Sequence, residues 1–462
     1  MILEILLALP VSDKTFFYKQ KILEGQKTKI GQIVKVRFRN KEQIGIVLKI
    51  PKKVSINKKL SDIEFSYENY FFNEEILKSI NFLSKYTCNS LSIILKNFLS
   101  GFKENFKKLE LIYHNHDFKA PILSEEQKNA LSSIKKKNQN SFSVISLYGV
   151  TGSGKTRVYM NLVKDKLQKN FQCLILVPEI ILTKEWVNEI FNDFGIVAEI
   201  YHSSIKESQK AKIWNHIMLN KSILIIGTRS SLFLPFKNLG IIVVDEEHDP
   251  SYKQEDKLIM NARDFAIIRA KNSNCPIILS SATPSIENVY NCKKNKFLEI
   301  QMLKRANKVP LPNIQIIDMK KEKNIISDKL ILQIKKNISL RLQTMIFINK
   351  RGYTSFTLCK KCGFIKQCPN CNVSLVLHNF INKESFLLCH HCSYREKFVN
   401  YCNNCKSESS IIFPGEGIEK IYEEIQKKFS GSKSIFISSD SIKKKANLNS
   451  ILKEIINNEV DI

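Results

Sequence analysis

A glycine-rich segment at 149–156, GVTGSGKT, has the residue types and the spacing of a loop that binds nucleotide phosphates. Its glycines allow the backbone to wrap tightly, so that successive N–H groups point at phosphate oxygens. Lys155 is expected to reach the β- and γ-phosphates, and the Thr156 hydroxyl is expected to bind Mg²⁺. The predicted nucleotide-binding residues are Gly149, Val150, Thr151, Gly152, Ser153, Gly154, Lys155 and Thr156.

A second polar group, DEEH at 245–248, follows the apolar run 241–244. Beside a phosphate loop, Asp245 is predicted to hold Mg²⁺ and Glu246 to accept a proton from the attacking water. His248 is expected to form a hydrogen bond to a neighbouring loop, which we take to be the one containing Ser281 and Thr283. The order of phosphate loop, DEEH and SAT is typical of helicases and not of kinases or small GTPases.

Eight cysteines between 359 and 405 form four C-x-x-C pairs, and each pair can place two thiolates on one tetrahedral ion. The 17 residues between Cys371 and Cys389 fit a common zinc spacing, so the inner pairs are predicted to share one zinc and the outer pairs a second. Such sites are structural. Iron–sulfur ligation and redox-active dithiols are the alternatives. The predicted groups are Cys359, Cys362, Cys402 and Cys405, and Cys368, Cys371, Cys389 and Cys392.

The elements that must position these groups are indicated by apolar runs. Short continuous runs alternate with helical patterns from 122 to 303, which is typical of a parallel sheet buried on both faces. The runs at 144–148, 173–177, 223–226, 241–244 and 277–279 are predicted strands, as are 344–348 and 434–438 further on. Segment 31–48 alternates like a hairpin with a basic outer face, closed by a turn at 39–43, and 73–99 has a helical pattern. Gln127 is predicted to read adenine N6 and N7, which would favour ATP over GTP; otherwise it is a surface residue.

The composition excludes membrane-spanning proteins, collagen-like proteins and secreted disulfide-rich scaffolds. The chain has 462 residues, 43% apolar and 25% charged, without an apolar run long enough to cross a bilayer or a recognisable signal peptide. We therefore expect a cytoplasmic protein of about three domains. The net charge of +28 favours nucleic acid as a partner, although a lysine-rich composition can also reflect an AT-rich genome.

Several long motifs together resemble the PriA family of replication-restart DNA helicases. They are GVTGSGKT, LVPEIILT (176–183), IIGTRSSLFLPF (225–236), VVDEEHDPSYKQ (243–254), SSATPSIEN (280–288), NKRGY (349–353), the cysteine block and GEGIEK (415–420). The resemblance implies an ATP-driven helicase that loads on stalled or collapsed forks, moves 3′→5′ on single-stranded DNA and initiates primosome assembly. It also implies that Tyr252, Lys253 and Arg263, with His248 and Ser281, couple DNA binding to the ATP site.

The resemblance also implies the domain plan, with two RecA-like α/β lobes, the second incomplete. Residues 1–103 are similar to the family's small β-rich module that grips a 3′ DNA end. A linker at 104–121 stands where the family has a winged helix. Lobe 1 is expected at 122–303 and lobe 2 at 304–462, with a two-zinc module at 355–410 that contacts the fork, single-strand-binding protein and other primosome components. ATP, Mg²⁺ and two Zn²⁺ are the expected cofactors.

Besides the missing winged helix, three departures from the family pattern qualify these expectations. The sequence given ends at NNEVDI (457–462), before the family's QxxGRxGR-type arginine-finger motif, so we expect this chain to bind DNA but to unwind little of it alone. Phe17 replaces the family's Asp in the 3′-end pocket, and 258–260 lack the usual Trp, Arg and Tyr. The alternatives are a catalytically impaired DNA-binding scaffold of the primosome and an RNA helicase.

Overall fold

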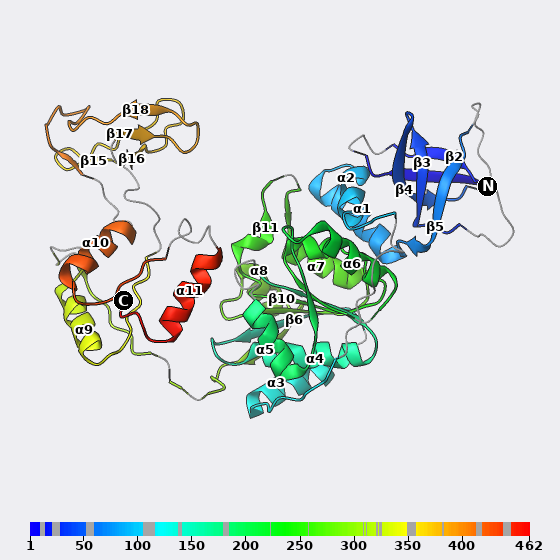
Figure 1. Ribbon diagram of the computed structural model, residues 1–462, viewed down its shortest axis with the longest axis horizontal. Helices are drawn as coiled ribbons and strands as arrows, with labels where there is room; N and C mark the ends of the chain where they lie inside the picture. Colours follow the sequence, from blue (N-terminus) through cyan, green and yellow to red (C-terminus); the bar gives the residue numbers. More distant parts are fainter. Residues whose placement is uncertain are drawn as a thin grey trace. The chain divides into compact units, whose positions relative to one another are not determined.

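The structure is a computed structural model of the 462-residue chain, which separates into two compact units, Met1–Leu311 and Pro312–Ile462 (Figure 1). Of the sequence features named above, residues 105–115, 179–183, 349–353 and 413–417 lie outside the described residues. The structure describes residues 1–9, 14–20, 28–51, 60–104, 116–136, 141–178, 184–221, 223–256, 258–307, 309–310, 312–319, 322, 326–348, 357–380, 383–412, 418–437 and 445–462.

The N-terminal module begins with a five-stranded antiparallel sheet in the order β2-β1-β4-β3-β5. Its predicted hairpin is confirmed as β3 and β4, but the turn is two residues long, Arg39 and Asn40, both with positive φ. The basic outer face is paired with carboxylates, because Lys35 contacts Glu42 and Glu104. The strands are β1 (Ile2–Leu7), β2 (Phe16–Lys19), β3 (Gln32–Phe38), β4 (Lys41–Lys49) and β5 (Ile63–Phe71).

Two short helices follow the sheet, α1 (Glu74–Thr87) and α2 (Leu91–Phe98). Their N-caps are Asn73 and Ser90. Each cap side chain accepts a hydrogen bond from the backbone N–H three residues later, as is usual at the start of a helix. Ile76, Ile80 and Leu83 of the predicted helical stripe are buried. Tyr86 is 47% exposed, so it is not part of that core face.

The centre of the first unit is a seven-stranded sheet in the order β14-β6-β13-β10-β7-β9-β8, all of whose pairs are parallel. The five predicted apolar runs of this region are all strands, and four of those five strands are buried along their whole length. The strands are β6 (Ser143–Gly149), β7 (Gln172–Leu176), β8 (Ala198–Tyr201), β9 (Leu224–Gly227), β10 (Leu239–Asp245), β13 (Pro276–Ser281) and β14 (Leu298–Met302).

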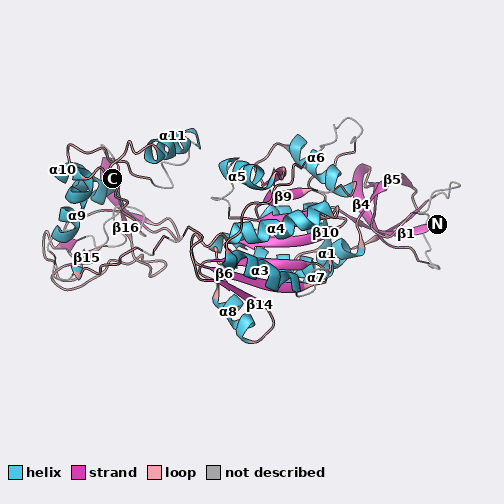
Figure 2. Ribbon diagram, turned by 90° about the horizontal axis from the view of Figure 1, so that it is seen from below, coloured by secondary structure: helices cyan, strands magenta, loops and turns pink. Residues whose placement is uncertain are grey.

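Helices cover both faces of this sheet, because alternate residues of each strand point to opposite sides. One hydrophobic cluster joins the sheet to α3, α4 and α5, and Figure 2 shows α3 and α4 over that face. The other cluster joins it to α6 and α7 and continues into α1 and α2, so the N-terminal module shares the core of the lobe. The helices are α3 (Glu125–Lys136), α4 (Lys155–Gln168), α5 (Lys184–Phe194), α6 (Glu207–Met218), α7 (Ala262–Asn272) and α8 (Ile286–Lys293).

Short elements connect the strands at the carboxyl edge of the sheet. Two 3₁₀ helices, η2 (Arg229–Phe233) and η3 (Pro250–Tyr252), follow β9 and β10. The strands β11 (Lys253–Gln254) and β12 (Met260–Asn261) pair with each other in the loop before α7. The phosphate loop, the DEEH segment and the SAT segment, which follow β6, β10 and β13, therefore lie at this edge.

The described residues of the second unit form three helices and a Cys-rich module. A small apolar cluster holds α9 (Asp328–Ser339) and α10 (Ile418–Lys428) together. Helix α11 (Lys445–Ile456) follows them in the chain. The Cys-rich module has short antiparallel strands: β15 (Leu358–Cys359), β16 (Val376–Phe380), β17 (Lys383–Leu388), β18 (Arg395–Lys397) and β19 (Ile411–Ile412).

Two strand predictions for the second unit are wrong. Residues 344–348 and the described part of 434–438 form no strand. The Thr344 N–H donates to the Asp461 carbonyl at 2.8 Å, and the Ile435 N–H donates to Ile462 at 3.0 Å. These segments are therefore bonded at isolated points and not along a ladder, and an apolar run does not reveal whether a neighbouring strand exists. In the part of the chain that the structure describes, no helix is long and apolar enough to cross a membrane.

Candidate functional site

The phosphate loop connects the end of β6 to the start of α4. Gly152 and Gly154 have φ values of +81° and +80°, in the left-handed region that glycine enters at little cost. A Cβ on Gly154 would collide with the side-chain amide of Gln127, which would have to move away from the loop. Because α4 begins at Lys155, its free N–H groups and the positive end of its dipole lie at the loop, which favours a bound anion.

Asp245 ends β10, and its carboxylate is held by two hydroxyl groups. The Ser280 hydroxyl donates to Oδ1 at 2.8 Å, and the Tyr159 hydroxyl donates to Oδ2 at 2.9 Å. The Tyr159 oxygen also lies 3.4 Å from Oγ1 of Thr156, one turn earlier on α4. Tyr159 therefore joins the two residues that are predicted to hold Mg²⁺. Sequence reasoning missed Tyr159, although its spacing from Thr156 places both on one helix face.

Lys155 and Glu246 affect each other's protonation across this site. The Lys155 ammonium donates to the Gly149 carbonyl at 2.8 Å. Burial lowers the pKa of Lys155, while the carboxylates of Glu246 and Asp245 act in the opposite direction. Burial raises the pKa of Glu246, the negative charge of Asp245 raises it further, and Lys155 opposes the shift. A carboxylate with a raised pKa is a better proton acceptor than an ordinary one, which suits a general base.

The DEEH and SAT segments meet through a side-chain hydrogen bond. Nδ1 of His248 lies 2.7 Å from Oγ of Ser281, and the same oxygen accepts the Thr283 N–H at 2.9 Å. The two segments are neighbours because β10 and β13 pair in parallel, with Asp245 opposite Ser280. The expected contact between His248 and the neighbouring loop is confirmed, and its role in coupling stays a prediction.

Glu247 is a buried carboxylate at the centre of a hydrogen-bond network, and the sequence analysis did not single it out. Its carboxylate accepts hydrogen bonds from the Asn288 amide at 3.0 Å and from the backbone and hydroxyl of Ser285 at 2.8 and 2.9 Å. It also forms an ion pair with Arg263 at 3.1 Å, where Arg263 donates to Ser285 as well. Arg263 is thus committed to a buried network that ties DEEH to α8, although sequence reasoning placed it with the residues that couple DNA to ATP.

Gln127 lies against the phosphate loop and is buried. Its Oε1 accepts the Ser124 N–H at 2.9 Å, and its Nε2 donates to the Ser153 carbonyl at 2.9 Å. The preceding Glu126 accepts the backbone N–H groups of Leu303 and Lys304. This segment therefore braces the loop from one side. Recognition of adenine by Gln127 stays a prediction.

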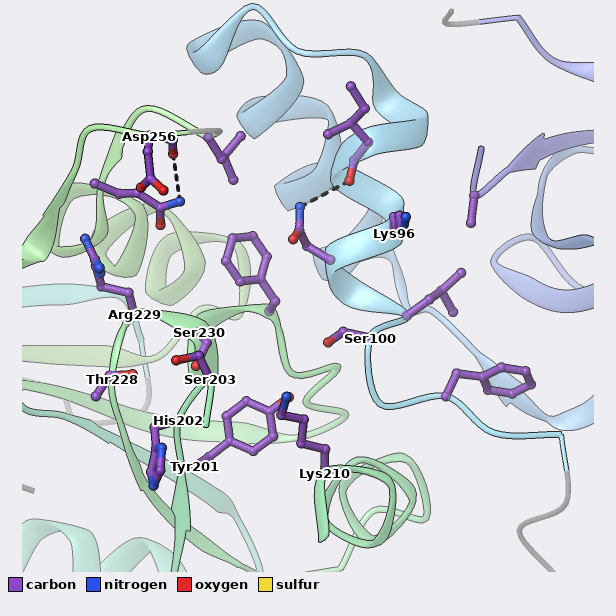
Figure 3. Close-up of a pocket in the computed structure, with 18 of the residues that line it drawn as sticks. Lys96, Ser100, Tyr201, His202, Ser203, Lys210, Thr228, Arg229, Ser230 and Asp256 are labelled. Carbon is purple, nitrogen blue, oxygen red and sulfur yellow. Dashed lines mark hydrogen bonds between the residues drawn. The ribbon is translucent and has the colours of Figure 1, made fainter. Parts of the chain in front are cut away.

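A cavity of about 1020 Å³ opens between α2 and the loops that follow β8, β9 and β10 (Figure 3). Arg229 of η2 lies on the lobe side, and its Nη1 donates to the Lys253 carbonyl at 3.1 Å. The buried Tyr252 hydroxyl lies 2.6 Å from the backbone oxygen of Asp245 and 3.1 Å from that of Leu176. The segment 252–253 therefore contacts both the cavity wall and the backbone of the predicted Mg²⁺ ligand.

The eight cysteines of the second unit gather into the two groups that the spacing predicts, with the ligand sulfurs of each group within 4.8 Å of one another. Cys359 and Cys405 sulfurs are 3.7 Å apart, and those of Cys368 and Cys392 are 3.5 Å apart. Four sulfurs at the usual Zn–S length of about 2.3 Å would be about 3.8 Å apart in a tetrahedron. The donor set and its spacing therefore fit zinc. Nδ1 of His391 lies 3.3 Å from the Cys371 sulfur, as an outer hydrogen-bond partner does.

Three regions of the chain match known protein families. Residues 124–292 match the DEAD/DEAH box helicase family, residues 4–100 match the 3′DNA-binding domain (3′BD) of PriA, and residues 368–397 match the Cys-rich region of the PriA DNA helicase. The chain is 41% identical to replication restart protein PriA of Rickettsia prowazekii (strain Madrid E), over 98% of this chain and 70% of that protein. It is 34% identical to the Bacillus subtilis (strain 168) protein of the same name, over 74% of this chain and 42% of that one.

Among solved structures, the chain is similar to the DUF1998 helicase MrfA bound to DNA, with 17% identity, a TM-score of 0.35 and coverage of 52% of this chain and 39% of that one. RecG bound to a three-way DNA junction gives 19% identity, a TM-score of 0.34 and coverage of 54% and 34%.

The lobe, its phosphate loop and the acidic strand end define an ATP-dependent DNA helicase, and this class of enzyme uses a nucleotide together with Mg²⁺. The chain belongs to the PriA family of replication restart proteins. It is thus a replication-restart helicase that binds DNA, and its two Cys₄ groups fit zinc. These similarities do not favour the alternative of a catalytically impaired scaffold.

Proposed function

We propose that the chain hydrolyses ATP to move 3′→5′ along single-stranded DNA at stalled or collapsed replication forks, where it initiates primosome assembly. The observation that carries this proposal is the shared hydroxyl of Tyr159, which brings the end of β10 to the start of α4 and so places Asp245 beside the phosphate loop. That arrangement suits phosphoryl transfer to water, in which positioning and charge stabilisation supply most of the rate.

In this proposal each residue of the site has a defined task. The backbone of 149–156 and the Lys155 ammonium bind the β- and γ-phosphates, and Thr156 and Asp245 hold Mg²⁺. Glu246 accepts the proton of the attacking water, supported by its raised pKa. Gln127 stabilises the loop through Ser153 and, after a change of side-chain rotamer, reads the adenine edge.

DNA occupies the cleft beside Arg229 and signals to the ATP site through the segments that touch both. In the first connection, Arg229 donates a hydrogen bond to the Lys253 carbonyl, and the neighbouring Tyr252 donates one to the Asp245 carbonyl. A second is the hydrogen bond between His248 and Ser281. Phosphate and stacking contacts are not specific for sequence, so binding is sequence-tolerant and falls steeply with salt.

The remaining parts extend the reach of the helicase on its substrate. Residues 1–103 hold a 3′ DNA end, 104–121 link that module to lobe 1 at 122–303, and lobe 2 at 304–462 carries the zinc module at 355–410. Two zinc ions keep that module folded and present it to the fork, to single-strand-binding protein and to other primosome components. The protein accordingly works in the cytoplasm at the replication fork.

Release of phosphate from ATP in the presence of forked DNA tests this function. We expect wild-type protein to be stimulated by forked DNA and Lys155→Ala to release almost none, because the variant loses its contact with the phosphates. Lys169→Ala, beyond the end of α4, is the matched control and should behave like wild type. Equal release by wild type and Lys155→Ala would show that the activity does not come from this site.

A competition experiment distinguishes a DNA helicase from an RNA helicase. Forked DNA and a structured RNA compete for the protein, and a DNA helicase should prefer the forked DNA.

A further inference from the structure

We propose that α2 of the N-terminal module is the second wall of the DNA cleft, so that the single strand engaged by the helicase lobe passes between this helix and η2. The inference rests on the proposed function, because it takes single-stranded DNA as the occupant of the cleft. It adds that the N-terminal module contacts the strand inside the motor, in addition to any contact that its sheet makes with a DNA end.

Cations face the cleft from three different elements. Lys96 comes from α2, Lys210 from α6 and Arg229 from η2, and Figure 3 shows these residues around one opening. Lys210 is paired with Glu207 of its own helix at 2.7 Å, so Lys96 and Arg229 are the main sources of positive charge. Hydroxyl groups that can bond to phosphate oxygens accompany them on both walls, with Ser100 after α2 and Thr228 before η2. Phosphate contacts of this mixed kind, from Lys, Arg and Ser or Thr, are the ordinary means by which proteins hold a nucleic-acid backbone.

Apolar side chains lie between these polar groups. Ile93 of α2, which is 37% exposed, and Phe233 of η2 both line the cleft. Aromatic and apolar surfaces of this kind pack against bases without regard to sequence. Among the described residues of the lining, the carboxylates belong to Glu42, which is paired with Lys35, and Asp256. The volume of about 1020 Å³ lies at the upper end for ligand sites and has room for a short stretch of single strand.

The α2 wall is held in place by a buried guanidinium that also holds the opposite wall. Arg269 of α7 is 1% exposed and contacts Glu75 of α1 at 2.9 and 3.0 Å. The same side chain donates to the Leu232 carbonyl of η2 at 2.5 Å and to the Leu234 carbonyl at 3.2 Å. Because one side chain binds α1 and η2 together, the spacing between α1–α2 and η2 is fixed.

A second contact fixes the end of α2 directly. The indole N–H of Trp214 on α6 donates to the Phe98 carbonyl at 2.9 Å, and Trp214 is completely buried. Amide and hydroxyl groups of Asn272 and Ser79 add a further bond between α7 and α1 at 3.0 Å. A module that is attached at α1 and at α2 by buried polar contacts moves with the lobe, so α2 can serve as a permanent wall.

Charge reversal on α2 tests the proposal. We expect Lys96→Glu to weaken binding of a fluorescent oligothymidine about tenfold at low salt and to reduce the salt slope by about 0.7, the value for one phosphate contact on a single strand. Lys85→Glu is the matched control, because Lys85 is an exposed lysine of the same module that does not line the cleft. Both lysines are on the surface, so neither change should unfold the chain.

Photocrosslinking supplies a readout that a loss of stability would not mimic. With p-benzoylphenylalanine at Asn97, which lines the cleft, we expect light-dependent attachment to oligothymidine. The same residue at Tyr86, exposed on α1 outside the cleft, should attach little. Equal affinities for Lys96→Glu and Lys85→Glu, or equal crosslinking at both positions, would overturn the inference while leaving the proposed function intact. If wild-type protein failed to bind oligothymidine, the proposed function and the inference would both fall.

Discussion

The hydroxyl of Tyr159 donates a 2.9 Å hydrogen bond to the carboxylate of Asp245, across 86 positions of sequence. Tyr159 is completely buried, and burial together with the negative charge of Asp245 raises the pKa of its phenol well above the ordinary value. The phenol therefore stays protonated at neutral pH and can act as a hydrogen-bond donor. It fixes one oxygen of Asp245 while Ser280 fixes the other, so the carboxylate has a single orientation toward the phosphate loop.

Removal of this donor should impair hydrolysis without removing nucleotide binding. We expect Tyr159→Phe to lower kcat for DNA-stimulated ATP hydrolysis about tenfold and to raise the Mg²⁺ concentration needed for half-maximal rate, since a hydrogen bond to a charged group contributes about 1.5–3 kcal/mol. Tyr290→Phe, an exposed tyrosine on α8, is the control. Unchanged Mg²⁺ dependence in Tyr159→Phe would show that the bond does not orient the metal ligand.

The raised pKa of Glu246 predicts the acid side of the pH–rate profile. A general base acts in its ionised form, so the rate must fall as pH decreases through its pKa. Because burial and Asp245 move that pKa above the ordinary value of 4.5, the fall should begin at a higher pH than for an exposed glutamate. The measurement is kcat/KM for ATP at saturating DNA from about pH 4 to pH 8, because kcat/KM reports the pKa values of the free enzyme, with circular dichroism to confirm that the chain stays folded. A kcat/KM that stays constant down to the ordinary glutamate range would contradict a raised pKa of the catalytic base.

Glu247 should matter for the stability of the chain. Its side chain has no exposed surface, and its loss leaves the guanidinium of Arg263, which is 10% exposed, without its buried partner. We expect Glu247→Gln to lower the free energy of unfolding by about 3–5 kcal/mol. Asn288→Ala, which removes one donor to the same carboxylate, should cost about 1–2 kcal/mol. Urea unfolding of both variants tests this order, and equal stability of Glu247→Gln and wild type would contradict it.

Zinc content tests the grouping of the cysteines. Metal analysis of purified protein should find about two zinc ions per chain, because each group supplies four thiolates and leaves no open position. Cys371→Ser should lose one ion and destabilise the module, since ligation and folding of such sites are linked. Cys88→Ser is the control, because Cys88 is exposed and belongs to neither group. Full retention of both ions by Cys371→Ser would refute the assignment of that ligand.

The sequence by itself was sufficient for features in which the chemistry depends on local spacing. The phosphate loop, the four C-x-x-C pairs and the continuous apolar strands each involve residues a few positions apart, so their geometry follows from the local backbone. The pairing of inner with inner and outer with outer cysteines was also predictable, because two nested rings are the simplest way to satisfy both ions. The same reasoning failed for 344–348 and for 434–437, the described part of 434–438, which form no strand in the described structure.

The tertiary structure decided which distant residues share a site. The Tyr159–Asp245 bond spans 86 positions, and the contact between Arg269 and Glu75 spans 194. Neither pair has a spacing that identifies it, because Tyr159, Arg269 and Glu75 lie on helices, and only the packing of those helices in the folded chain determines which residues they meet. The cleft between α2 and η2 arises in the same way, from the packing of the N-terminal helices into the core of the lobe. The spacing of residues in the sequence determines a motif whose members are a few positions apart. A site formed by residues from distant helices and strands depends instead on how the buried faces of those elements pack together.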